Sequence, residues 1–180
     1  MASGLICPYI HLVTHLFRAP VTSDYPDLVT WIPDASACAC WAGPQLRFPF
    51  VAEELPELLG VGRVHSYCMV TPDNVLVGFG QFWGRDEKTV HLGRIIVAPH
   101  KRGNGLGTVL CKFLIAEALS STHAEKVTLR VYRDNRAAFS VYSKLGFIGV
   151  ETESNSDVLA METIIAAAQL RDAVAQLQTR

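Results

Sequence analysis

Short apolar-rich stretches of strand length run through the middle of the chain. Residues Arg63 to Thr71 and Val75 to Trp83 form two of them, and Pro72-Asp73-Asn74 between them is a turn-forming sequence. A second polar turn leads into the stretch from His91 to Val97. Strand-length stretches joined by short turns predict an antiparallel meander. Four more strands are predicted, at Leu12 to Phe17, Lys126 to Tyr132, Phe147 to Thr152 and Val158 to Ile164, with a helix as the alternative for the last.

The stretch from His91 to Val97 is apolar on both of its alternating faces, as in a strand covered on both sides. Simple alternation places Val90, Leu92 and Ile96 on one face and His91, Gly93, Ile95 and Val97 on the other. The pair Ala98-Pro99 ends the strand, because proline donates no ladder hydrogen bond.

A longer apolar pattern at helical spacing follows this strand. It predicts an amphipathic helix whose core face is Leu106, Val109, Leu110, Phe113, Leu114 and Leu119. Because Lys126 to Tyr132 comes after a strand and a helix, it should lie parallel to the His91 strand. Other helices are predicted from Ser23 to about Trp31, from Glu53 to Leu59, from Arg136 to Leu145 before Gly146, and over the tail from about 165 to 178.

The segment from Ala35 to Phe50 shows neither the alternation of a strand nor the apolar spacing of a helix. Gly43-Pro44 and Pro49 interrupt it, which argues against a strand or a long helix. Large apolar residues on a loop often line a pocket, and a loop folded onto the core would account for them equally well. The predicted lining of an acceptor site is Trp41, Phe48 and Phe50, with Trp83 at the end of its strand.

Composition narrows the class of protein. The chain has 180 residues, 49% hydrophobic and 18% charged, which is typical of a folded globular domain. A net charge of −1 without a basic run argues against nucleic-acid binding. The sequence shows no apolar run of membrane-spanning length and no basic start of a signal peptide, so we expect a cytoplasmic protein without a membrane partner.

The five cysteines have no repeated spacing, which favours reduced thiols over a disulfide framework. Cys38-x-Cys40 lacks a matching His or Cys pair, so we expect no metal site. Cys111 falls inside the long helix, where a buried, inert thiol is the preferred interpretation over a nucleophile.

The glycine-rich turn Arg102-Gly103-Asn104-Gly105-Leu106-Gly107 precedes the long helix. A helix start has backbone N–H groups without intrahelical partners and a partial positive charge, and glycine lets an anion approach them. The expected ligand is a phosphate or diphosphate. A Walker loop would need a Lys after Gly107, where this chain has Thr108, and the glycine spacing does not fit a dinucleotide fingerprint.

Two blocks of sequence together resemble the GNAT family, the Gcn5-related N-acetyltransferases. The first is Arg-x-x-Gly-x-Gly, from Arg102 to Gly107, after a strand ending in Val-x-Pro. The second is Asn135-x-x-Ala138-x-x-x-Tyr142-x-x-x-Gly146-Phe147, which follows the next strand. The resemblance covers roughly residues 10–164 and implies one α/β domain over 1–180, with a mixed, mostly antiparallel sheet flanked by helices.

The resemblance also implies a ligand and its site. Acetyl-CoA would lie where the His91 and Lys126 strands splay apart, and no metal is implied. The backbone of Ile96 and Val97 would bind the acetyl carbonyl and pantetheine arm, and the side-chain amide of Asn135 would bind the cofactor. Tyr142 would protonate the coenzyme A sulfur, although a packed core aromatic is an alternative for it. The backbone amides expected to hold the diphosphate are those of Arg102, Gly103, Asn104, Gly105, Gly107 and Thr108.

The general base is harder to assign. Many GNAT members carry a Glu at the position that His91 occupies here. A His with an ordinary pKa near 6.5 could act as the base, directly or through water, or could simply be satisfied at the strand's edge. Weaker alternatives are Glu53, Glu54 and Asp86.

These features predict an N-acetyltransferase that moves acetyl from acetyl-CoA to a primary amine, on a small molecule or a peptide, by direct attack in a ternary complex. A non-catalytic acyl-CoA-binding module on the same fold is the alternative, because the strand Glu is missing. A nucleotide binder of another class is disfavoured by the missing Lys. Family habit and the tail helix make a homodimer a candidate assembly.

Overall fold

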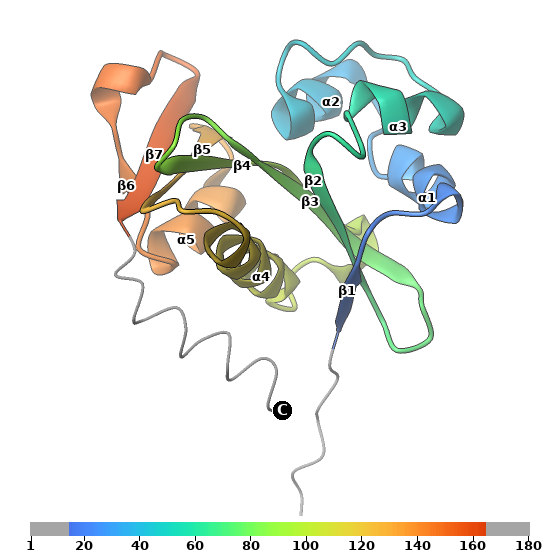
Figure 1. Cartoon of the computed structure of the whole chain (residues 1–180). Helices are drawn as coiled ribbons and strands as arrows, with labels where there is room; N and C mark the ends of the chain where they lie inside the picture. Colours follow the sequence, from blue (N-terminus) through green and yellow to red (C-terminus); the bar gives the residue numbers. More distant parts are fainter. Residues whose placement is uncertain (1–14, 165–180) are drawn as a thin grey trace, which may run out of the picture.

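The computed structural model describes residues 15–164, which form a seven-stranded sheet with helices on both faces (Figure 1). The strand order is β1-β2-β3-β4-β5-β7-β6. Within it β4 and β5 are parallel, and every other neighbouring pair is antiparallel. The predicted mixed, mostly antiparallel sheet flanked by helices is therefore confirmed. The strands are β1 (Leu16–Arg18), β2 (His65–Val70), β3 (Leu76–Gly84), β4 (Thr89–Val97), β5 (Lys126–Tyr132), β6 (Ile148–Gly149) and β7 (Val158–Ile164).

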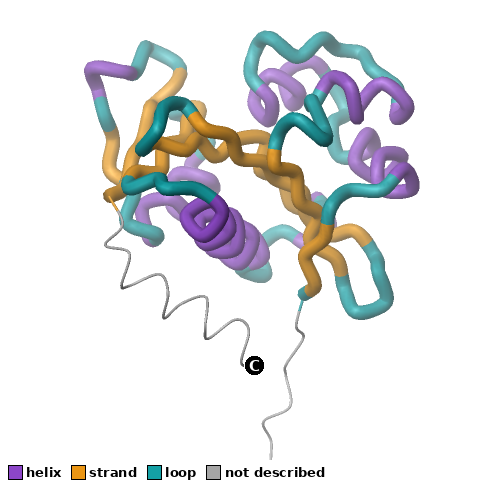
Figure 2. The backbone as a smooth tube through the Cα atoms, viewed as in Figure 1, coloured by secondary structure: helices purple, strands orange, loops and turns teal. Residues whose placement is uncertain are grey.

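The helices form two layers around the sheet (Figures 1 and 2). One face carries α1 (Tyr25–Thr30), α2 (Ala35–Ala42) and α3 (Leu55–Leu58), and the other carries α4 (Leu106–Ser121) and α5 (Arg136–Lys144). Short 3-10 turns are η1 (Thr22–Asp24), η2 (Ala52–Glu54), η3 (Pro99–Lys101) and η4 (Glu151–Glu153). No helix in the described range 15–164 has the length and apolar character to cross a membrane.

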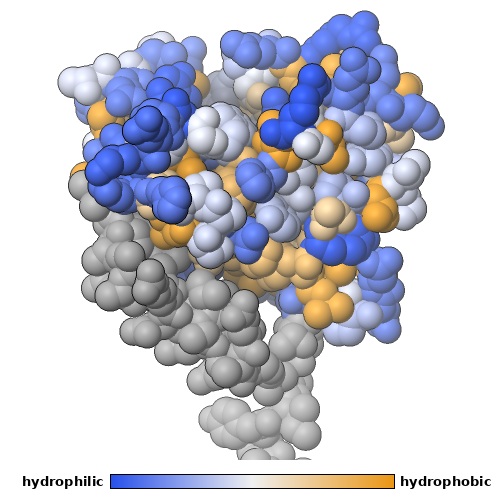
Figure 3. Space-filling model, in the orientation of Figure 1, coloured by the Kyte–Doolittle hydropathy of each residue, from blue (hydrophilic) through white to orange (hydrophobic). Residues whose placement is uncertain are grey.

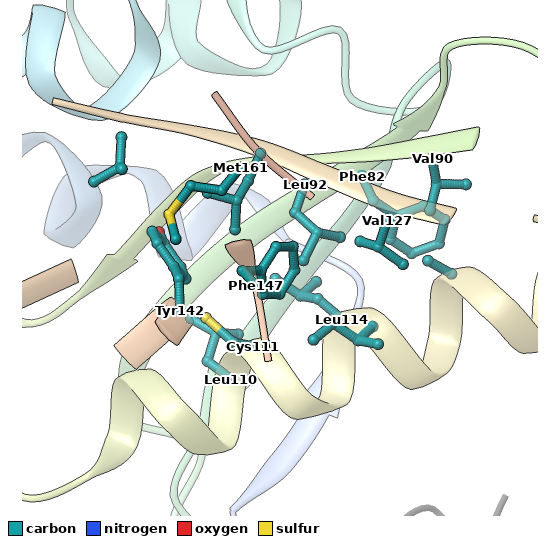
Figure 4. Close-up of a cluster of buried hydrophobic side chains, with 14 of the residues drawn as sticks. Phe82, Val90, Leu92, Leu110, Cys111, Leu114, Val127, Tyr142, Phe147 and Met161 are labelled. Atoms are coloured by element: carbon teal, nitrogen blue, oxygen red, sulfur yellow. The ribbon is translucent and has the colours of Figure 1, made fainter. Parts of the chain in front are cut away.

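Each layer has its own hydrophobic core. Leu110 and Leu114 of α4 are fully buried against Phe82 and the strands beneath, and burying one such side chain stabilises the fold by about 1.5–3 kcal/mol. The close-up in Figure 4 shows this cluster. At Gly80 a Cβ would come within 2.5 Å of a Leu114 methyl group, so α4 packs directly on the backbone of β3. A second core lies beneath α1–α3, around Phe79.

The two parallel strands stay together over three residue pairs. Thr89, Val90 and His91 of β4 pair with Lys126, Val127 and Thr128 of β5, while both strands continue well beyond these pairs. The predicted divergence of the two strands at their carboxyl ends is thus present. We call the segments after His91 and after Thr128 the β4–β5 divergence.

A β-bulge in β4 overturns the predicted faces of that strand. The register with β3 shifts between Phe79 and Gln81, and Arg94 has a φ of 52°. Beyond the bulge every side chain changes face. Ile95 and Val97 pack in the α4 core with Val90 and Leu92, whereas Ile96 packs in the other core. The prediction that Ile95 and Val97 share the His91 face was wrong.

Other predicted elements differ in extent. Residues 35–42 form helix α2, where we expected irregular chain; Asp34 caps it, accepting a hydrogen bond from the Ala37 amide at 2.8 Å. Strand β6 is confined to Ile148–Gly149, shorter than the predicted Phe147 to Thr152. The predicted start of the first strand at Leu12 and the predicted tail helix lie outside the described residues.

Candidate active site

The loop before α4 presents a row of unpaired backbone amides. In the described part of the chain, none of the five consecutive N–H groups from Gly103 to Gly107 has a hydrogen-bond partner. Gly103 and Gly105 have φ values of 81° and 77°, and a Cβ added at either would meet nothing within 4 Å. The loop therefore needs glycine for its backbone conformation and leaves open space in front of its amides.

Two side chains hold this loop in shape. The Asn104 Nδ2 donates to the carbonyls of Lys101 and Arg102 at 3.1 and 3.3 Å, and Arg102 Nε donates to the Val97 carbonyl at 3.2 Å. Two of the amides expected to bind the diphosphate are already used within the loop: Arg102 N–H donates to the Pro99 carbonyl and Thr108 N–H to that of Gly105. The amides of Gly103, Asn104, Gly105 and Gly107 remain available, as does that of Leu106.

The end of β4 leads directly into this loop. Ala98 N–H donates to the Val77 carbonyl at 3.0 Å, and the alternation of an antiparallel ladder then directs the Ile96 amide to β3 and the Val97 amide to the opposite edge. That edge faces β5 across the divergence. The Val97 amide is thus placed to meet a ligand between the strands.

Asn135 and Cys40 bring two other elements to the divergence. Asn135 is the N-cap of α5, where its Oδ1 accepts from the Ala138 amide at 3.1 Å. Its Nδ2 lies 3.7 Å from the Cys40 sulfur near the end of α2. Helix α2 therefore reaches across from the other layer to the start of α5, and the Asn135 amide predicted to bind the cofactor stands at this junction.

Tyr142 reaches into the core from α5. Only 8% of it is exposed, and Figure 4 shows its ring beside Leu110 and Cys111 of α4 and Met161 of β7. Burial raises the pKa of its hydroxyl far above the ordinary value near 10, so the group stays protonated at neutral pH. Phe139, one turn before Tyr142 on α5, is 41% exposed.

His91 lies on the sheet face below α1–α3, at the last paired position before the divergence. Its Nδ1 is 2.9 Å from the Thr128 hydroxyl, which donates its proton to the Val90 carbonyl at 3.1 Å. The hydroxyl must then accept from His91, which assigns the proton to Nδ1 and leaves Nε2 as an acceptor. Burial, with the charges of Arg85 and Arg130, lowers the pKa of His91 to about 4, well below the expected 6.5.

Beside His91 lies an aromatic and cationic cluster, of which the sequence predicted Trp83 as an acceptor contact but gave Arg94 no role. The Trp83 indole lies 5.0 Å from the imidazole, centroid to centroid, and the Arg94 guanidinium carbon is 5.8 Å from a Trp83 ring centroid. A Cβ at Gly93 would come within 2.5 Å of this indole, so the indole lies across the glycine. Arg94 reaches this face because of the bulge, whose position no sequence pattern marked.

The other residues predicted to contact the acceptor pack on the second core. Phe50 is buried, and Phe48 lies edge to face with it at 5.7 Å between centroids. Trp41 of α2 packs against Phe79, and its Nε1 is buried without a hydrogen-bond partner in the described chain. For Phe48 and Phe50 the structure favours the alternative of a segment folded onto the core. The Nε1–H of Trp41, the residue after Cys40, thus remains a donor without a partner among the described residues.

Two of the three alternative bases have other hydrogen-bond partners, and the cysteine remains a thiol. Glu54 accepts from Arg47 at 2.9 Å and from the Val51 amide at 3.0 Å, and Asp86 accepts from the Lys88 amide. Burial raises the pKa of Cys111 to about 12, so it remains a thiol, as the inert interpretation requires. Among residues 15–164 no three His, Cys, Asp or Glu side chains gather as metal ligands.

Comparison with known proteins identifies the family. The sequence model of the acetyltransferase (GNAT) family matches residues 14–147. Because this is most of the chain, the protein belongs to the GNAT acetyltransferase family. The expectation drawn from the two sequence blocks is confirmed.

Two curated relatives match parts of the chain. The uncharacterized N-acetyltransferase YobR of Bacillus subtilis is 41% identical over 56 residues, 31% of this chain and 22% of its own. An N-acetyltransferase 9-like protein of Nematostella vectensis is 29% identical over 82 residues, 44% of this chain and 40% of its own. The matches thus span less than half the length of either relative.

Solved structures show the same fold. Spermidine N-acetyltransferase from Vibrio cholerae, in complex with CoA and spermine, has a TM-score of 0.68 at 17% identity over 84% of this chain and 95% of its own. A GNAT-family acetyltransferase from Bacillus anthracis has a TM-score of 0.67 at 13% identity, with the same two coverages. At these identities the likeness concerns the fold.

Proposed function

We propose that this chain transfers an acetyl group from acetyl-CoA to a primary amine, by direct attack while both substrates are bound. The observation that carries the proposal is the row of five unpaired amides from Gly103 to Gly107, next to the strands β4 and β5 that stop pairing at His91. Family membership supports the same chemistry.

The amides suit the diphosphate of coenzyme A. They cluster at the start of α4, where the aligned peptide dipoles place about half a positive charge. A pantetheine arm would then run along the edge of β4 past the Val97 amide, which the ladder turns toward β5. The bound acetyl-CoA would supply the acetyl group as a thioester. The residues that would hold it come from β4, the loop, and Asn135.

The acceptor amine must lose a proton before it can attack. An alkyl amine with a pKa of about 10.4 is neutral in roughly one molecule in 2,500 at pH 7, which costs about 4.6 kcal/mol. His91 presents an unprotonated Nε2 near the end of the paired strands. In this proposal Nε2 accepts that proton, directly or through a water, and desolvation of the ammonium on the half-buried sheet face lowers the remaining cost.

Tyr142 acts at the other end of the reaction. Its hydroxyl stays protonated at neutral pH, so it can donate to a sulfur that enters the divergence. Donation to the departing thiolate of coenzyme A is the role we assign to it. The unpartnered Trp41 Nε1 is a second donor that substrate binding could satisfy.

A non-catalytic acyl-CoA-binding module is the second candidate. The observation that favours it is the low pKa of His91, about 4, because a base that weak removes a proton from an amine inefficiently. Such a module would bind acetyl-CoA through the same loop and release no free coenzyme A.

A thiol-release assay separates the two candidates. Purified protein with acetyl-CoA is tested against amines that include spermidine, amino acids and a peptide N-terminus. Free thiol that depends on an amine supports the transferase, whereas stabilisation by acetyl-CoA without any thiol release supports the binding module. Thermal stabilisation by ATP or NAD but not by acetyl-CoA would contradict both.

A further inference from the structure

Arg94 carries a half-buried positive charge that the described residues do not neutralise. Its Nη1 donates to the Leu59 carbonyl at 3.0 Å and to Gln81 Oε1 at 2.7 Å, and both acceptors are uncharged. Within residues 15–164 its Nε and Nη2 donors have no partner, and no carboxylate lies within 4.0 Å. A buried charge is normally paired, because desolvation of a lone ion is costly.

The surroundings hold this guanidinium in one place. Gln81 is fully buried, and its Nε2 donates to the same Leu59 carbonyl at 3.0 Å and to the Ser66 hydroxyl at 2.7 Å. The indole of Trp83 supports the guanidinium from the side at 5.8 Å. Nη1 is thus anchored, while the three N–H donors of Nε and Nη2 have no partner among the described residues. The planar guanidinium is held in place with these donors available to a ligand.

The backbone is strained at the same position. Arg94 has a φ of 52°, a conformation that side chains other than glycine rarely adopt. This strain is part of the bulge that brings the residue to the His91 face. Strain kept at a residue that also exposes unused donors points to a ligand.

Two acidic groups on the strand and loop next to His91 already have partners. Glu162 of β7 pairs with Lys126 at 3.2 Å, and Glu153 pairs with Arg85 at 3.4 Å. Arg130, on the same face of β5 as Thr128, forms no ion pair with a described residue. Neither of these carboxylates is paired with Arg94 or Arg130.

We propose that Arg94 binds a carboxylate of the acceptor, so that the favoured substrate is an amine that also bears a carboxylate, such as an amino acid. The inference rests on the proposed acetyl transfer and gives it a substrate class. A carboxylate matches two parallel N–H donors of the guanidinium, and it would neutralise the charge. A polyamine, which the Vibrio cholerae protein acetylates by its name, would meet like charge here.

The test compares acceptors that differ at one end. A series of ω-amino acids from glycine to 6-aminohexanoate is measured beside the matching amides and diamines. Binding is measured by calorimetry to protein saturated with coenzyme A and to protein alone, and turnover is measured with acetyl-CoA. For the chain length that fits best, we expect the carboxylate to bind about 10- to 100-fold tighter than its amide, the range for a charged hydrogen bond.

Variants locate the preference at Arg94. R94Q should abolish the difference between acid and amide, and R94K, which keeps the charge without the planar guanidinium, should retain only part of it. R63Q removes an equal charge from an exposed site and should keep the preference unchanged. Melting curves report whether each variant folds, and the comparison of acid with amide on the unaltered protein needs no variant.

The outcomes separate this inference from the proposed function. Equal affinity for acid and amide, or a preference for diamines, would overturn the role of Arg94 even if acetyl transfer is observed. Absence of acetyl transfer to every amine would remove the proposed function, while a carboxylate preference in binding that R94Q abolishes would still establish the site.

Discussion

The two sides of the candidate site recognise their ligands by different means. On the α4 side, the loop from Gly103 to Gly107 offers backbone amides and no side-chain charge of its own. On the α1–α3 side, the Trp83 indole lies beside both His91 and Arg94, and a buried glutamine fixes the arginine. One side is built from peptide groups and the other from particular residues.

This difference indicates which half of the site can change its side chains and still bind its ligand. Backbone amides at a helix start bind a diphosphate whatever the neighbouring side chains are, so this half needs only glycines at the right spacing. Recognition of the acceptor depends on which side chains a bulge turns to the sheet face. Polar residues cover most of the face seen in Figure 3, and surface character alone does not single out an acceptor.

The largest effect should come from an acid placed in the loop. In G105D the new carboxylate stands at the helix start where the diphosphate would bind, and repulsion of about 3 kcal/mol at ~5 Å corresponds to roughly 100-fold weaker coenzyme A binding. Aspartate is one of the few side chains that tolerate a left-handed backbone, which limits the strain at a φ of 77°, so the fold should persist. Calorimetry with coenzyme A measures the effect.

Gly62 supplies the matched control. It has a φ of 89° and open space around it, like Gly105, but lies outside the loop. G62D should show a similar change in melting temperature with unchanged coenzyme A affinity. Equal affinity losses in both variants would mean that strain, and not the diphosphate site, is responsible.

Tyr142 tests the chemistry between the two sides. Y142F should reduce kcat about 100-fold, the range for a lost general acid, with little change in stability, because the substitution keeps the buried ring and removes only the hydroxyl. Y67F is the opposite case: its hydroxyl contacts Glu117 at 3.0 Å, so its loss should cost about 1 kcal/mol of stability without slowing turnover. Unchanged kcat in Y142F would exclude the acid role.

His91 should couple stability to pH. Its folded pKa of about 4 lies below the unfolded value near 6.5, so the unfolded chain binds the extra proton between these values. The His91 contribution is fully present above pH 6.5 and is lost as pH falls to 4, by up to about 3 kcal/mol. Denaturant titrations at pH 7 and pH 4.5 should show this loss, and H91Q should reduce it.

His91 should also determine how kcat/KM depends on pH. With His91 as base, kcat/KM stays level down to pH values near 4, and H91Q lowers it about tenfold because a weak base contributes modestly. A fall in kcat/KM below about pH 6.5 that persists in H91Q would assign the base to another group.

The smallest effect is expected from the side chain that shapes the loop. N104A removes two exposed hydrogen bonds to Lys101 and Arg102 and should weaken coenzyme A binding about threefold by loosening the amides. N155A is its control, because Asn155 accepts from two amides in a turn before β7. It should alter melting but not coenzyme A affinity.

Sequence patterns predicted the framework because the framework follows from periodicity. Apolar stretches bounded by turn sequences predicted β2 to β5, and apolar residues at helical spacing predicted α4. The order of strand, helix and strand required β4 and β5 to be parallel. The glycine spacing predicted the amide loop, since its chemistry belongs to the backbone. Asp34 followed by an alanine-rich stretch was a cap signal for α2, which the nearby Gly43-Pro44 obscured.

The acceptor side was less accessible because it depends on a bulge. Arg94 adopts a positive φ that glycine or asparagine would have signalled, and nothing near it marks the change of register. Simple alternation therefore placed Ile95 and Val97 on the wrong face and gave Arg94 no role. Burial likewise moved the pKa of His91, which depends on neighbours distant in sequence.

The central claim is that the amides from Gly103 to Gly107 bind the diphosphate of coenzyme A. Amide NMR spectra recorded during titration with coenzyme A, and separately with pantetheine, which lacks the diphosphate, test it directly. The account predicts that these five resonances shift and saturate with coenzyme A and stay in place with pantetheine. Binding of coenzyme A that leaves the five resonances unmoved would contradict it.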